Sequence, residues 1–355
     1  MIFEGKSILV IGGTGSLGKV LVRRILTNEL GKPSKVIVMS RDEAKQQAMR
    51  VSYMHMKVTT DEVIYNNFRQ LLEFRVGNVR NYADVCSAVK DSNIVINAAA
   101  LKQVPLCEYF PEQALRTNCL GPVNIVRAIR ENGYPVDIVV GISTDKACKP
   151  VNVMGMSKAI QERIFVSANV LIPKTRFNCV RYGNVLASRG SVIPLFHEQI
   201  KSGGPVTITA ANMTRFLLSI DQGVDTIFAA ISEGKEGEIY VPIVESATVE
   251  NMAKALIGSR NIEVEIIGIR PGEKMHEILV SEEECHHVIQ RGKYYVILPM
   301  LPELRGANKE LPNALDSEFC SADTVLNLEG TIELMDKHNL NVSTDAIAET
   351  EELLR

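Results

Sequence analysis

The sequence contains no tryptophan, few other aromatic residues and no excess of charge of either sign. Only 5% of its 355 residues are aromatic, and 39 lysines and arginines nearly balance 42 aspartates and glutamates, giving a net charge of −3. So neutral a chain has no bulk positive charge with which to bind nucleic acid. It also lacks an apolar run long enough to cross a membrane, and no signal-peptide pattern precedes its first apolar run. We therefore expect a cytoplasmic protein without nucleic-acid or membrane partners.

Metal-binding and disulfide patterns are also missing. The seven cysteines are odd in number and form no CxxC pair. They are predicted to be reduced, mostly buried apolar residues, and no metal site is expected. What the chain does have is length and 46% hydrophobic residues, enough for one large α/β domain with a smaller lobe, or for two domains.

Short β-branched runs alternate with helical patterns through the first half of the chain. Amphipathic stretches at 17–27 and 122–131 lie between such runs. This alternation predicts an α/β fold, a Rossmann-type doubly wound parallel sheet, and the uniformly apolar runs indicate strands covered on both faces. The expected strands are residues 7–11, 35–40, 72–77, 94–100, 138–144 and 178–185.

Turns containing glycine and proline become frequent after about residue 186. We expect a cofactor-binding Rossmann domain at 1–185, a smaller substrate-binding lobe at 186–300 and a C-terminal extension at 301–355. Helical patterns at 220–233 and 249–257 are also compatible with packing on the sheet, so the boundary is soft. The polar, acidic extension is predicted to be a helical appendage or an oligomer contact.

A glycine-rich turn follows the first expected strand and opens a helix. Glycines at this spacing tighten the turn, let the backbone approach a pyrophosphate and leave the helix N-terminus free to bind it. A plain tight turn would not need three glycines so arranged. The turn therefore predicts a dinucleotide site formed by Gly12, Thr14, Gly15, Ser16, Leu17 and Gly18.

The end of the second expected strand selects the cofactor. An NAD site has an acidic side chain there, whereas this chain has Ser40 and Arg41, which suit a 2′-phosphate. NADP is therefore favoured over NAD, and Asp42 is expected to cap the next helix. The ends of the third and fourth strands should also face the cofactor, although close packing explains the alanines equally well; these residues are Asn78, Val79, Ala98, Ala99 and Ala100.

The chemistry is predicted to lie at the end of the fifth strand, because ligands bind at the carboxyl edge of parallel sheets. Thr144, Asp145 and Lys146 occupy that edge. Met154 and Lys158 are four residues apart in a helical pattern at 154–166, so they share one helix face. An Asp–Lys pair with a helix lysine at this spacing indicates catalysis rather than surface charge.

On these residues the chain resembles the extended short-chain dehydrogenase/reductases. More narrowly, it resembles the C5-inverting UDP-N-acetylglucosamine 4,6-dehydratases of the capsule and O-antigen polysaccharide biosynthesis family. Most relatives carry tyrosine at the position of Met154, but one branch has an MxxxK motif, which implies that methionine is native to a working enzyme. The resemblance runs from Gly12 to about Lys274 and rests on residues 40–43 (SRDE), 99–105 (AALKQVP), 143–146 (STDK), 181–185 (RYGNV), 188–194 (SRGSVIP), 213–216 (MTRF) and 270–274 (RPGEK).

This resemblance implies a cycle in which NADP is reduced and then reoxidised. Lys146 would remove the C5 proton of a 4-keto sugar, Asp145 would protonate the departing C6 hydroxyl, and Lys158 would bind the nicotinamide ribose. Lys146 must be neutral to act as a base, so its pKa is expected to be depressed by burial or by Lys158. The resemblance also implies a homo-oligomer and a UDP-sugar substrate bound by Lys102, Asn184, Val192, Arg215, Arg270 and Glu273.

Other interpretations stay open, namely a C5-retaining dehydratase, a C4 epimerase or a non-catalytic cofactor sensor. An epimerase needs no Asp–Lys acid–base pair, and a sensor would have no reason to keep one, so Asp145 and Lys146 favour the dehydratase. Met154 leaves one role unfilled, because a thioether cannot accept the O4 proton and Thr144 has far too high a pKa. The candidate acceptors are Lys146, Asp145 and a bound water.

Overall fold

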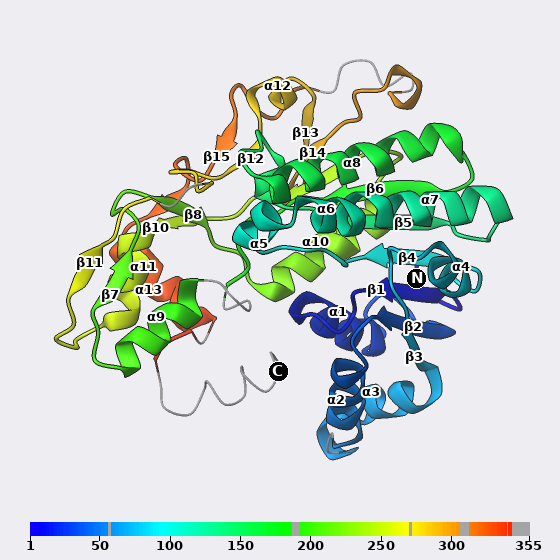
Figure 1. Cartoon of the computed structure of the whole chain (residues 1–355), viewed down its shortest axis with the longest axis horizontal. Coiled ribbons are helices and arrows are strands. Elements are labelled where there is room, and N and C mark those ends of the chain that lie inside the picture. The colour runs from blue at the N-terminus through cyan, green and yellow to red at the C-terminus, as the bar shows by residue number, and fades with distance from the viewer. Residues whose placement is uncertain (56–57, 187–191, 270–271, 306–311, 339, 343–355) are drawn as a thin grey trace.

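A computed structural model of the chain describes residues 1–55, 58–186, 192–269, 272–305, 312–338 and 340–342. Its central feature, within those residues, is a nine-stranded sheet (Figure 1). The first six strands in sequence, together with β9, run parallel, and β14 and β13 add an antiparallel hairpin at one edge. The Rossmann-type prediction is confirmed. The strand order is β13 (Val288–Arg291), β14 (Tyr294–Ile297), β9 (Ile239–Pro242), β6 (Arg176–Val180), β5 (Ile138–Ile142), β4 (Ile94–Asn97), β1 (Ser7–Ile11), β2 (Lys35–Ser40) and β3 (Leu72–Val76).

Helices cover both faces of this sheet, which is why its central strands are apolar throughout. All five residues of β1 and of β5 are buried. One covering layer contains α4 (Tyr82–Val89), α7 (Gly121–Asn132) and α8 (Val153–Leu171), in contact in that order. The other contains α10 (Ile220–Glu233), α1 (Ser16–Leu26), α3 (Val58–Leu71) and α2 (Glu43–Met54).

Four of the six expected strands end earlier than predicted. β3, β4, β5 and β6 end at Val76, Asn97, Ile142 and Val180, one to five residues before the apolar runs do. Just past these points the backbone still donates to the neighbouring strand, as Gly77 does to Ser40 at 3.0 Å and Ser143 does to Val180 at 2.7 Å, before the chain turns into the loops at this edge of the sheet. The residues that follow the true strand ends are those predicted to bind ligands.

A smaller lobe has its own hydrophobic core, which includes Phe196, Leu256 and Met335. Its helices are α9 (Val192–Lys201), α11 (Val249–Ile257) and α13 (Leu328–Lys337). Its strands pair as β7 (Val206–Ile208) with β11 (Val264–Ile266), and β10 (Ser246–Thr248) with both β8 (Thr214–Phe216) and β16 (Val325–Leu326). A further pair, β12 (Ile278–Val280) with β15 (Phe319–Cys320), packs into the core of the large sheet.

The lobe is not one continuous stretch of chain. The helical pattern at 220–233 forms α10 on the large sheet, whereas the pattern at 249–257 forms α11 in the lobe. The C-terminal helix α13 packs on α11 (Figure 1). Among the described residues, none of the helices has the length and hydropathy that a bilayer crossing requires.

The remaining helical segments are short and lie mostly around the carboxyl ends of the strands. They are α5 (Val104–Tyr109), α6 (Pro111–Leu115), the π-helix η1 (Arg116–Leu120), the 3₁₀ turn η2 (Asp145–Ala147), α12 (Glu282–Cys285) and the 3₁₀ turn η3 (Pro302–Leu304).

Candidate active site

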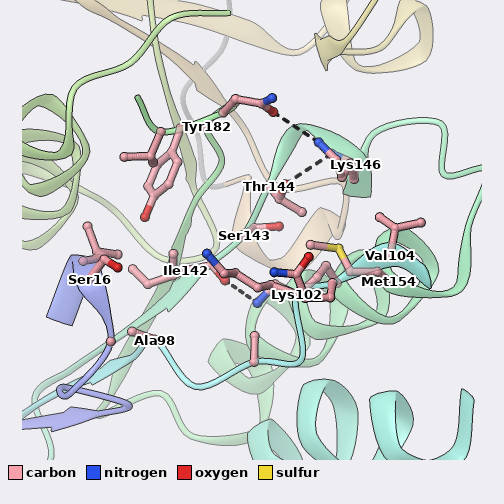
Figure 2. A pocket seen from close by; sticks show the side chains of 18 of the residues that line it. Ser16, Ala98, Lys102, Val104, Ile142, Ser143, Thr144, Lys146, Met154 and Tyr182 are labelled. Atoms are coloured by element: carbon pink, nitrogen blue, oxygen red, sulfur yellow. Dashed lines mark hydrogen bonds between the residues drawn. The ribbon is translucent and has the colours of Figure 1, made fainter. Parts of the chain in front are cut away.

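A cleft of about 1360 Å³ lies between the carboxyl ends of the parallel strands and the lobe. Figure 2 shows Thr144, Lys146 and Met154 on one side of this cleft, with Ser16 and Ala98 on the other. Of the predicted site residues that the structure describes, all but Asn78 and Asp145 line it. Arg270 and residues 188–191 of the motif at 188–194 lie outside the described residues.

The glycine-rich turn fits a dinucleotide. Gly12 has φ +82°, and a Cβ there would stand 2.7 Å from the Ala99 backbone nitrogen. A Cβ on Gly18 would lie 2.5 Å from the Gly13 Cα, so the first helix can pack this close only without a side chain. Gly15 is the N-cap of α1 and makes no side-chain cap, which leaves the helix N–H groups facing the cleft for a pyrophosphate.

Several guanidinium groups lie near the end of β2, where the cofactor's adenosine is expected. Arg41 lines the cleft from the end of β2. Burial lowers the pKa of Arg80, and the nearby charges of Arg41 and Arg116 lower it further, so three guanidinium groups share this region. Asp42 caps α2 as predicted, since its side chain accepts a hydrogen bond of 3.0 Å from the Lys45 backbone N–H.

Asn78 does not reach the cleft as expected. Its Oδ1 instead accepts a hydrogen bond of 3.1 Å from the Arg80 backbone N–H, and its own backbone N–H donates to Asp84 at 2.8 Å. The neighbouring Val79 does line the cleft. Asn78 therefore shapes the turn after β3, a local role that strand-end position alone does not distinguish from ligand contact.

Asp145 and Lys146, the predicted acid–base pair, are in contact on the turn η2. The Lys146 Nζ lies 3.1 Å from Asp145 Oδ1 and 3.3 Å from Asn184 Oδ1. Thr144 Oγ1 donates to the same Asp145 Oδ1 at 2.7 Å. Asp145 is only 1% exposed and lies behind Thr144 and Lys146, the two residues that line the cleft.

The expected depression of the Lys146 pKa is wrong. Burial does oppose the charge on this amine, but the carboxylates of Asp145 and Glu277 outweigh it and raise the pKa above its usual value. Lys158 is not among the charges that act on it. The sequence could not give this result, because Glu277 is 131 residues away and contacts Lys146 only in the folded chain.

Lys158 shows the depressed pKa instead. Its Nζ donates to the Ile142 carbonyl and, at 2.7 Å, to Gln161 Oε1. Burial lowers the pKa of this amine to about 8. Since Lys158 also lines the cleft, it is placed to donate hydrogen bonds to a cofactor hydroxyl.

Met154 lies in an apolar cluster at the start of α8. It is 6% exposed and packs with Cys107 and Ala114, under the segment that contains Leu101 and Val104. Gly155 explains how the helix comes so close to η2, because a Cβ there would stand 2.1 Å from the Lys146 carbonyl oxygen. The absence of a side chain at Gly155 is thus what brings Met154 beside the acid–base pair.

Several cleft residues were not predicted as site residues, and two of them bear on proton transfer. Tyr182 lines the cleft, but burial raises the pKa of its phenol, which disfavours the tyrosinate form that a base would need. Glu277 also lines the cleft, with Oε1 3.4 Å from Lys146 Nζ. Tyr182 lay within a matched motif, residues 181–185, whereas Glu277 is three residues beyond the last one.

The part of the cleft predicted to bind the substrate combines cations with carboxylates. Arg215 donates to the Thr214 carbonyl at 2.7 Å, and its Nε lies 3.8 Å from Glu277 Oε1. Glu273 also lines the cleft, and its Oε2 is buried without a hydrogen-bond partner among the described residues. Unpaired carboxylate oxygens of this kind are available to accept hydrogen bonds from a ligand.

A comparison with protein families identifies the group of proteins to which the chain belongs. Residues 8–299 match the model of the family described as "Polysaccharide biosynthesis protein". The chain belongs to this family. It is therefore an extended short-chain dehydrogenase/reductase of the nucleotide-sugar dehydratase and epimerase group.

Individual relatives divide between two activities. The chain is 42% identical over 344 residues to a UDP-glucose 4-epimerase of Rickettsia bellii (strain OSU 85-389), covering 94% of this chain and 96% of the relative. It is 40% identical over 302 residues to an inverting UDP-N-acetylglucosamine 4,6-dehydratase of Campylobacter jejuni, covering 84% of each. The relatives therefore establish that the chain belongs to the nucleotide-sugar dehydratases and epimerases, but they do not choose between the two activities.

Solved structures agree on the fold. The structure of Pen from Bacillus thuringiensis matches with a TM-score of 0.83 and 31% identity, covering 95% of this chain and 100% of that one. A dTDP-glucose 4,6-dehydratase of Streptomyces venezuelae matches with a TM-score of 0.63 over 76% of this chain, at 19% identity. The second likeness supports the fold alone.

Proposed function

We propose that the protein catalyses the 4,6-dehydration of UDP-N-acetylglucosamine with inversion at C5, using NADP. The product would be a UDP-2-acetamido-2,6-dideoxy-arabino-hexos-4-ulose for surface polysaccharide synthesis. One observation carries the proposal, the contact of 3.1 Å between Lys146 Nζ and Asp145 Oδ1 at the edge of the cleft. Eliminating water requires a base for the C5 proton and an acid for the C6 hydroxyl, whereas 4-epimerisation requires neither.

The pair has both functions if it exchanges one proton internally. Bound NADP⁺ would accept the C4 hydride and later return it to C6. The O4 proton would pass to water in the cleft, the resulting C4 ketone would acidify the C5 proton, and water would reprotonate C5 on the opposite face when the hydride returns. Lys146 passes a proton to Asp145 and then, as a neutral amine, removes the proton from C5. Asp145 returns its proton to the departing C6 hydroxyl through the Thr144 hydroxyl, which lies between it and the cleft. Both residues end with their starting charges, so the raised pKa of Lys146 is compatible with a role as base.

The cofactor and the nucleotide follow from the charges at the two ends of the cleft. Arg41, with Arg80 and Arg116 nearby, provides a cationic region suited to a 2′-phosphate, which supports NADP over NAD. At the other end, Arg215 offers a guanidinium for a diphosphate and Glu273 an acceptor for ribose hydroxyls.

A second candidate is 4-epimerisation of UDP-glucose. It is favoured by the name of the Rickettsia bellii relative, whose match extends over nearly the whole chain. An epimerase would leave the Asp145–Lys146 pair without a reaction step, and this is why dehydration is the first choice.

One experiment separates the candidates. The purified protein is incubated with NADP in deuterated water, with UDP-N-acetylglucosamine or UDP-glucose in parallel, and the products are followed by mass spectrometry and NMR. Dehydration with inversion gives loss of water, deuterium at C5 and an arabino-configured 4-keto sugar. A 4-epimer without loss of water would replace the proposal with epimerisation. Bound cofactor with no turnover of either sugar would indicate a sensor.

A further inference from the structure

Glu277 is a buried carboxylate that faces the acid–base pair from outside the large sheet. It directly precedes β12 and is only 3% exposed, yet it lines the cleft. Its Oε1 lies 3.4 Å from Lys146 Nζ and 3.8 Å from Arg215 Nε. Its Oε2 is buried and has no hydrogen-bond partner among the described residues. Burying a carboxylate in this way costs free energy unless the charge is paired or hydrogen-bonded.

The backbone of Glu277 is held from both sides by the C-terminal part of the chain. Its N–H donates to Ser321 Oγ at 2.9 Å, and the Ser321 N–H donates to the Glu277 carbonyl at 2.8 Å. The same Ser321 hydroxyl also lies 2.6 Å from Thr214 Oγ1, next to Arg215 on β8. Two elements outside the large sheet therefore fix where this carboxylate stands relative to Lys146.

The Lys146 amine thus lies between two carboxylates of different origin. Asp145 belongs to the same turn and exchanges a proton with the amine in the proposed reaction. While Asp145 carries that proton, Glu277 is the anion that still contacts the amine among the described residues. Its contact restricts the amine to the edge of the cleft, and its charge favours the ammonium form.

We propose that Glu277 is a positioning residue of this active site, which holds the Lys146 amine at the cleft and sets the pH at which that amine loses its proton to solvent. This inference rests on the proposed dehydration. The charged and titratable groups around Glu277 are Lys146, Asp145 beyond it, Arg215 on β8 and the adjacent His276, whose Nδ1 lies 2.8 Å from Thr214 Oγ1.

The test is the pH profile of kcat for Glu277→Gln with UDP-N-acetylglucosamine and NADP. The charge of Glu277 raises the pKa of Lys146, and the charge of Arg215 lowers it. Without the Glu277 carboxylate, Arg215 still lowers this pKa and is no longer opposed by Glu277. The alkaline limb, where the pair loses its shared proton, should move to lower pH by about 1 to 3 units. At neutral pH, kcat should fall by about 10- to 100-fold through loss of orientation, with little change in KM.

Two further variants separate positioning from structure. Glu277→Asp keeps the negative charge but moves it away from the Lys146 amine. The alkaline limb of this variant should move to lower pH by less than that of Glu277→Gln. It also provides the test if Glu277→Gln does not fold. Glu238→Gln removes another buried carboxylate, paired with Arg291 at 2.8 Å outside the cleft, and should leave the profile in place.

An alkaline limb at the wild-type pH in both Glu277 variants would overturn the inference, whatever the loss of stability. Failure of the proposed function looks different, because the wild-type protein itself would then form no dehydrated product.

Discussion

At the residue scale, Met154 is a cleft residue whose side chain cannot take part in the expected proton transfers. Met154 is nearly buried and packs against Cys107 and Ala114, so its side chain contributes apolar contacts rather than a titrating group. The tyrosine that does line the cleft, Tyr182, has a raised pKa and is a poor source of tyrosinate. We therefore propose that the amine and the carboxylates around Lys146 carry out the proton transfers.

This assignment predicts unequal effects of two substitutions. Lys146→Met removes the base and should lower kcat by about 10²- to 10⁴-fold, as expected for loss of a general base. Met154→Leu conserves volume in an apolar cluster, so it should cost less than about 1.5 kcal/mol of stability and leave most of the turnover. Steady-state assay of both variants decides the matter. A Met154→Leu loss equal to that of Lys146→Met, or a strong gain on Met154→Tyr with the same product, would contradict it.

Cofactor choice is also predicted at a single residue. Arg41→Ala should weaken NADPH binding by about 10- to 150-fold, because a hydrogen bond to a charged group is worth about 1.5–3 kcal/mol. NADH binding should change little, since it lacks the 2′-phosphate. Titrations that follow nicotinamide fluorescence measure both, and the control is Arg50→Ala on α2, which lies over the Phe74 ring outside the cleft. Equal losses for the two cofactors would contradict the role in 2′-phosphate recognition.

At the element scale, the site depends on how closely α8 approaches the turn η2. The N-terminus of α8 is capped by Asn152, whose side chain accepts a hydrogen bond of 2.8 Å from the Gly155 backbone N–H. The same Asn152 donates to the Gly272 carbonyl at 3.1 Å, which ties the helix to the substrate end of the cleft. The start of α8 thus lies close to the turn η2 and is hydrogen-bonded to the segment at Gly272.

Gly155→Ala is expected to damage this approach. Its Cβ would meet the Lys146 carbonyl at 2.1 Å, so α8 or η2 must shift, and a misplacement of about 1 Å can cost about 100-fold in rate. Gly223→Ala in α10 is the matched control, because its Cβ would meet its nearest atoms at 3.6 Å. That variant should keep full activity and gain up to about 1 kcal/mol from helix propensity. Assays and thermal unfolding compare the two, and full activity of Gly155→Ala would refute the packing argument.

At the scale of the whole molecule, a buried ion triad joins the large sheet to α12. Arg181 is 1% exposed and contacts Glu162 on α8 at 2.7 Å and Glu284 on α12 at 2.6 Å. It also donates to the Leu279 carbonyl on β12, two residues after Glu277. Sheet, α8 and the strand that follows Glu277 are therefore held together through one guanidinium.

Removing that guanidinium should weaken the whole fold. Arg181→Met leaves two buried carboxylates without their partner, and breaking a buried pair in this way costs about 3–5 kcal/mol. Lys6→Ala, which removes the exposed Lys6–Asp137 pair, should cost less than about 1 kcal/mol. Denaturant unfolding of both variants measures the difference, and similar midpoints would show that the triad contributes little.

The sequence by itself determined the fold class, the glycine-rich turn and the position of Thr144, Lys146 and Lys158 at the cleft. These follow from short-range patterns, because strand periodicity, helix spacing and turn glycines are local, and the carboxyl ends of parallel strands meet at one edge. The residues at which four strands end, and the side-chain contacts of Asn78, depend on neighbouring segments of the fold. On these points the structure differs from the predictions.

Only the tertiary structure shows which charged groups face one another in the site. Glu277 meets Lys146 across 131 residues, and Arg181 meets Glu284 across 103. A pKa depends on burial and on every charge within a few ångströms, and no sequence pattern records which distant carboxylate will face an amine. The position of Lys146 at the cleft was therefore predictable from the strand end, but its raised pKa and its second carboxylate were not.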